Sequence, residues 1–70
     1  MTFTAIIEEG ENGWLVGQLQ EIPAVIDQGR TLEELKQNLL NGLQFYLETQ
    51  RELTAQDYAG RTYTQTLLVA

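Results

Sequence analysis

Acidic side chains around one predicted hairpin are the first candidates for chemistry in this 70-residue chain: Glu8, Glu9, Glu11 and Glu21. Paired carboxylates can bind a divalent cation or act as general acid and base. The loop does not match the D-x-[DN]-x-[DN]-G calcium pattern, and the chain contains no His or Cys to assist the carboxylates. We therefore expect solvated side chains here, with no catalytic residue and no metal site.

The glycines and aromatic residues form the second group that could bind a ligand. The stretch GENGWLVG, residues 10–17, lacks the lysine of a phosphate-binding loop and joins two predicted strands instead of a strand and a helix. Trp14 and three Tyr residues could stack on bases, but a formal net charge of −6 leaves no positive groove for nucleic acid. We expect no cofactor and no direct nucleic-acid binding, and we assign the aromatic residues to packing.

Length and composition limit the architecture to one domain, residues 1–70, with a marginal core. Without Cys, no disulfide can strengthen that core, so a partner or a second copy of the chain is expected. The longest apolar run is LLVA, four residues, and the start lacks the basic and apolar blocks of a secretion signal. The sequence predicts a cytoplasmic protein with no membrane partner.

Hydrophobic patterning predicts three strands in the first half of the chain, at residues 2–9, 14–20 and 24–28. The Gly and Asn residues at positions 10–13 supply the positive φ angles that a hairpin loop requires. Pro23 cannot donate to a central ladder, so it marks a bend after the second strand. Gly17, within that strand, indicates a bulge or the close approach of another backbone.

A helix follows, with a clear start signal. Gly29 permits a left-handed turn, and Thr31 with Glu34 forms a T-x-x-E capping box. The spacing of apolar residues then changes to three and four, which places one stripe on the sheet: Leu32, Leu35, Leu39, Leu43 and Tyr46. The period fades near residues 51–54, where we expect the helix to end.

Residues 61–70 alternate in the manner of a fourth strand, with Tyr63, Gln65, Leu67 and Val69 on one side. The predicted fold class is α+β: a two-layer βββαβ arrangement of a three-stranded antiparallel meander, one long helix and a fourth strand. One helix can cover only one face of the sheet. Apolar residues predicted for both faces or an edge require another cover: Ile6, Leu15, Leu19 and Leu68.

Two helix residues stand apart from the apolar stripe. Phe45 lies about 130° from the centre of the stripe, so it is either an isolated exposed aromatic residue or an anchor at a protein interface. Gly42 weakens the helix by about 1 kcal/mol relative to Ala and marks either a close contact or a neutral surface position.

Residues 13–48, GWLVGQLQEIPAVIDQGRTLEELKQNLLNGLQFYLE, resemble the HicB antitoxin family. Shared features are a Gly-aromatic strand, a proline bend and a Q-G-x-T-x-E-E helix start, most specifically Gln28, Gly29, Thr31, Glu33 and Glu34. The chain departs from the family where Ala24 and Val25 follow Pro23 in place of Gly-Cys, and where Leu35 replaces a common Ala. Four positions are taken as fold-defining: Pro23, Gly29, Thr31 and Glu34.

The resemblance implies a degenerate ribonuclease-H-like fold without nuclease activity. It also implies a partner, a small basic mRNA-cleaving HicA toxin, which a net charge of −6 suits. Many family members carry a C-terminal DNA-binding segment, and we expect this chain, which stops at Ala70, to be a single-domain member without it. The predicted partner-binding residues are Glu8, Glu9, Glu11, Glu21, Asp27 and Phe45.

Two other functions remain open at the level of sequence. The chain could be a stand-alone member of the family that forms a homo-oligomer, a dimer or a tetramer, through paired edge strands. It could also be a hydrolase that uses its acidic residues, although the groups that assist such chemistry are missing. The favoured interpretation is a non-enzymatic binding module.

Overall fold

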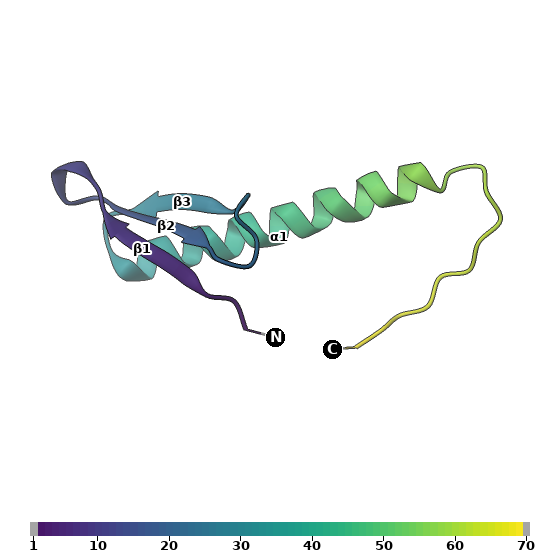
Figure 1. Ribbon diagram of the computed structural model, residues 1–70, viewed down its shortest axis with the longest axis horizontal. Coiled ribbons are helices and arrows are strands. Elements are labelled where there is room, and N and C mark those ends of the chain that lie inside the picture. The colour runs from purple at the N-terminus through teal and green to yellow at the C-terminus, as the bar shows by residue number, and fades with distance from the viewer. Residues whose placement is uncertain (1, 70) are drawn as a thin grey trace.

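The computed structural model describes residues 2–69, in which an antiparallel sheet precedes one long helix. Figure 1 shows the sheet packed on the first half of the helix and the second half projecting beyond it. The predicted α+β class is therefore confirmed. The elements are β1 (Ala5–Glu9), the 3-10 turn η1 (Glu11–Gly13), β2 (Leu15–Leu19), β3 (Ile26–Gly29) and α1 (Leu32–Asp57).

The sheet is a meander in the order β1-β2-β3, so β1 and β3 are its two edges. Ile7 pairs with Gly17, and Gly17 pairs with Asp27. Because side chains alternate along a strand, these residues share the face that packs on α1, together with Ala5 and Leu19. Leu15 and Leu19 thus face the helix, which corrects the expectation that they add apolar area to a second face.

The first hairpin turns as the glycines and Asn predict. Asn12 has φ 58° and Gly13 has φ 79°, both in the left-handed region. The turn closes because the Gly10 amide donates to the Trp14 carbonyl at 2.7 Å and the Trp14 amide donates to the Glu11 carbonyl at 3.1 Å.

β2 ends at Leu19, and Pro23 lies in the tight turn that follows, in which the Val25 amide donates to the Ile22 carbonyl at 2.9 Å. Its fixed φ suits the second position of such a turn. The side-chain amide of Gln18 also donates to the Pro23 carbonyl at 2.8 Å. Because the turn uses residues 22–25, the third strand starts at Ile26, two residues later than predicted.

The helix begins at the predicted signal. The Thr31 hydroxyl accepts a hydrogen bond from the Glu34 amide at 3.1 Å, which satisfies one free donor of the first turn. Gly29 serves a different purpose from the predicted one. It does not adopt a left-handed φ, and the backbone of Leu35 lies so close that a Cβ atom would stand 2.7 Å from the Leu35 amide nitrogen.

The core lies between α1 and the sheet and consists of Leu19, Val25, Leu35, Leu39 and Leu43. Gly17 forms neither the predicted bulge nor a close contact with another backbone: its pairing is regular, and the nearest atoms belong to side chains, with Leu39 Cδ1 3.0 Å from the place of a Cβ atom. Of the predicted helix stripe, Tyr46 is half-buried and Leu32 is exposed. Leu32 lies outside the core because α1 packs on β2 and β3 and leaves β1, the strand on the side of Leu32, uncovered.

The second half of the chain departs from the prediction. α1 continues to Asp57, beyond the end expected near residues 51–54, and Gly60 then reverses the chain with φ 82°. Residues 62–69 form no strand, so the predicted fourth strand is absent from the described part of the chain. A strand needs a neighbouring backbone for its hydrogen bonds, and in Figure 1 this segment turns back after α1 and runs apart from both the helix and the sheet. We call residues 62–69 the tail.

Candidate functional site

The candidate site is an apolar groove beside the open edge of β1. Phe3, Ala5 and Ile7 line it from the β1 side, and Leu32, Lys36 and Leu40 line it from α1. The α1 residues lie four apart, so they form one row along the helix, displaced from the buried row of Leu35, Leu39 and Leu43. The groove exists because α1 lies over β2 and β3 and leaves the underside of β1 uncovered.

The groove is chemically suited to bind protein. Leu40 is 59% exposed, Leu32 45% and Ile7 39%, so apolar area that normally belongs to a core faces water. Among residues 2–69, no strand pairs with the outer side of β1, and an edge strand offers backbone donors and acceptors to another chain. Such a surface accepts an added strand, whose backbone pairs with β1 and whose alternate side chains enter the groove.

A second surface is the outer face of the sheet, which no element of residues 2–69 covers. Ile6 and Ile26 are more than half exposed there and flank Gln18 in one cross-strand row. The next row places Glu8 and Gln28 on either side of Val16. At the hairpin end, the Arg30 guanidinium stacks over the Trp14 ring at 4.1 Å. This face is therefore mixed, with apolar residues between polar ones.

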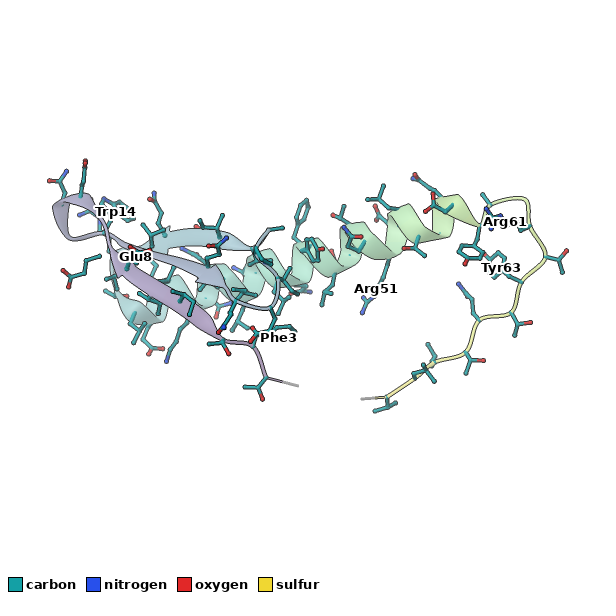
Figure 2. The ribbon with its side chains drawn as sticks, viewed as in Figure 1. Phe3, Glu8, Trp14, Arg51, Arg61 and Tyr63 are labelled. Carbon is teal, nitrogen blue, oxygen red and sulfur yellow. The ribbon has the colours of Figure 1, made fainter. Side chains whose placement is uncertain are left out.

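The acidic residues predicted to bind a partner do not form one group. Glu8 and Glu9 end β1 and Glu11 lies in η1, so these three occupy the hairpin end of the sheet, where Figure 2 labels Glu8. We call them the hairpin acids. Asp27 lies on β3, the opposite edge strand, and its carboxylate accepts from the Gln28 amide at 2.8 Å. No metal-binding group of three or more such side chains occurs within residues 2–69.

Glu21 lies at the other end of the sheet and has a structural role. Its carboxylate accepts a hydrogen bond from the Thr4 amide at 2.6 Å, next to the bond from the Gln20 amide to the Thr4 carbonyl. The amide of Thr4 stabilises the charged form, so the pKa of Glu21 lies below its ordinary value of 4.5. This contact fixes the start of β1 against the end of β2.

Phe45 is 71% exposed on α1, away from the core, as its helical position predicts. The tail is more exposed still, at 94% for Leu67, 92% for Leu68 and 99% for Val69. Sequence reasoning placed these last residues in the sheet and missed the groove. Leu40, four residues from Lys36 and eight from Leu32, was the available signal, but only the placement of α1 shows which strand it leaves uncovered.

A shallower hollow separates the tail from the second half of α1, where Leu47, Arg51 and Tyr58 face Tyr63. The Tyr58 and Tyr63 rings meet edge to face at 5.8 Å, and the Arg61 guanidinium lies 4.9 Å from the Tyr58 ring. Figure 2 shows Arg61 and Tyr63 at the reversal of the chain. These aromatic contacts hold the start of the tail and leave Leu67, Leu68 and Val69 without cover.

No helix among the described residues is both long and apolar enough to cross a membrane. No family model and no solved structure matches the chain. The chain is similar to a UPF0150 protein of Archaeoglobus fulgidus, with 27% identity over 60 residues that cover 86% of this chain and 87% of that protein. The two chains are therefore similar over most of both lengths.

Proposed function

We propose that this chain is a non-enzymatic, HicB-like antitoxin of a toxin-antitoxin system, which binds and neutralises a small basic mRNA-cleaving toxin of the HicA type in the cytoplasm. The observation that carries the proposal is the position of the hairpin acids at one end of the sheet, where Glu8 shares the outer face with the exposed Ile6 and Ile26. The HicB-like helix start supports it, because Gly29 contacts Leu35 closely and Thr31 caps the helix.

Binding to a basic protein follows from the physical properties of this surface. Carboxylates at one end attract a cationic partner and orient it during encounter. The exposed isoleucines then supply apolar contact area, which gives the complex its lifetime. A toxin that uses cationic side chains to hold mRNA loses that surface when it faces the hairpin acids.

The first test is whether an adjoining reading frame encodes a small basic protein, and the second is co-expression of that protein with this chain. We expect the two proteins to co-purify and their Kd to rise with salt, because the attraction is between charges. The triple variant Glu8→Gln, Glu9→Gln, Glu11→Gln should raise Kd by about tenfold or more, because it removes the carboxylates at the hairpin end of the sheet.

A matched control removes the same charge from the far half of α1: Glu48→Gln, Glu52→Gln, Asp57→Asn. This control should change Kd by less than about twofold at physiological salt, since distant exposed charges are screened. The proposal is wrong if no complex forms, or if the two triple variants weaken binding equally.

A second candidate function is a stand-alone homo-oligomer without a toxin. The groove beside β1 and the exposed tail favour it, because both present apolar area that a second copy could cover. Sedimentation of the purified chain without any partner tests self-assembly, and co-purification of a basic partner tests toxin binding. Self-assembly without such a partner favours the second function.

A further inference from the structure

We propose that the tail of one copy, residues 62–69, docks in the groove beside β1 of a second copy and forms the fourth strand of that sheet. By symmetry, the second copy returns its own tail to the first. This assembly goes beyond toxin binding and needs no toxin. It uses the backbone edge of β1 and the groove, and it leaves the outer face of the sheet, which carries Glu8, free.

The tail has the properties of a strand without a neighbour. Residues 62–69, TYTQTLLV, are rich in residues that favour strands, yet they pair with no strand in the described chain. Leu67, Leu68 and Val69 are more than nine-tenths exposed. Fully burying one such side chain contributes about 1.5–3 kcal/mol, so the exposed tail favours any arrangement that covers it.

Groove and tail match in pattern. Alternation places Tyr63, Leu67 and Val69 on one side of the tail together with one polar residue, Gln65, and the other side carries three threonines and Leu68. The apolar side can face Leu32 and Leu40 while the tail backbone pairs with β1. The threonine side then continues the mixed polar character of the outer face of the sheet.

The length of the tail favours docking in the groove of a second copy over docking in the groove of its own chain. α1 runs about 20 Å beyond Leu43, at about 1.5 Å per residue. Returning along it uses about six extended residues at roughly 3.3 Å each, so residues 61–66 would be consumed before the groove begins. Within one chain, only Leu67 to Val69 of the described tail could enter the groove, whereas the tail of another copy can lie along the whole of β1.

Charge and size also agree with a second copy. Two chains of net charge −6 repel each other, so their contact should use uncharged segments. Residues 62–69 carry no charged side chain, and Lys36 is the charged residue among those lining the groove. A reciprocal exchange uses ten groove residues and eight tail residues per copy, close to the about 20 residues a side of a standard interface.

Sedimentation equilibrium of the chain alone tests the proposal. We expect a dimer, and we expect Leu67→Asp and Leu40→Glu each to raise the dimer dissociation constant by about 100-fold, because each places a charge in the apolar contact. Leu68→Asp, on the threonine side of the same tail, and Phe45→Glu, on the other face of α1, should leave the dimer intact. Helix content by circular dichroism verifies that each variant is folded.

Cysteine cross-linking gives an independent test, because the natural chain has no Cys. A mixture of Ile7→Cys copies and Leu67→Cys copies should form a disulfide-linked heterodimer. A second mixture, of Ile7→Cys copies and Leu68→Cys copies, should form less of it. A monomeric natural chain overturns the proposal. So does a dimer that survives both Leu67→Asp and Leu40→Glu, or equal cross-linking from positions 67 and 68. Since no toxin is present, these failures are distinct from failure of toxin binding.

Discussion

Gly29 and Leu35 meet so closely that the fold leaves no room for a side chain at position 29. A Cβ atom there would lie 2.7 Å from the Leu35 amide nitrogen and 3.0 Å from its Cα. Leu35 is fully buried, so this contact joins the last residue of β3 to the centre of the core. The close contact between β3 and the first turn of α1 fixes the position of the helix start against the sheet.

Gly29→Ala should lower the free energy of unfolding by about 2 kcal/mol or more, because the clash is with backbone that cannot move aside. Urea unfolding followed by circular dichroism measures the change. Gly42→Ala is the matched control: its Cβ would meet only Val25 Cγ1 at 3.4 Å, and Ala favours the helix by about 1 kcal/mol. Equal loss of stability in both variants would contradict this account of Gly29.

Gly17→Ala should destabilise the protein less than Gly29→Ala, by about 1 kcal/mol. The added methyl group would lie 3.0 Å from Leu39 Cδ1 and 3.1 Å from Leu35 Cδ2, which are ends of side chains and can shift slightly. The same urea titration orders the two variants. A larger loss at position 17 than at position 29 would show that the core is more rigid than these contacts imply.

Thr31→Ala should cost about 1 kcal/mol, because the Glu34 amide loses the hydroxyl that accepts its hydrogen bond. Thr31→Ser keeps an acceptor at the same place and should retain most of the stability. Thermal unfolding of the three proteins measures the difference. If Ser and Ala are equally destabilising, the hydroxyl of Thr31 does not stabilise the helix start.

The free energy of unfolding should depend on pH through Glu21. Its folded pKa lies below the ordinary 4.5 because the Thr4 amide donates to the carboxylate, so ionised Glu21 stabilises the fold above that value. This contribution is lost as the pH falls through the folded pKa. The difference in unfolding free energy between the natural chain and Glu21→Gln should therefore shrink below pH 4.5.

A constant difference between the two proteins across the acid range would contradict the assigned hydrogen bond. Asp27→Asn provides a second acidic variant for comparison. Its carboxylate accepts only the amide of the next residue, Gln28, and joins no other strand, so we expect a smaller effect on unfolding.

Local signals explain which parts of the fold could be predicted. Thr31 and Glu34 predicted the helix start, and Asn12 with Gly13 predicted the hairpin, because each depends on residues within a few positions. The fourth strand was predicted from alternation and strand propensity, and the family resemblance implied it as well, yet residues 62–69 form no strand. Neither local signal reports whether a partner backbone is near. The later end of α1 likewise reflects helix propensity that continues after core contacts stop.

The candidate site was predicted only in part for the same reason. Glu8, Glu9 and Glu11 are neighbours in sequence and stay together, whereas Glu21 and Asp27 lie elsewhere on the sheet. The groove depends on how α1 crosses the strands. Nothing local to Ile7 or Leu40 reveals that α1 leaves β1 uncovered.

Hydrogen exchange of the backbone amides of β1 and the tail tests most directly whether the tail of a second copy pairs with β1. In the chain alone, at concentrations where it assembles, we predict that amides of residues 62–69 exchange much more slowly than in Leu67→Asp, and that β1 amides gain protection with them. Tail amides that exchange as fast as those of an unstructured peptide at every concentration of the chain would contradict the account.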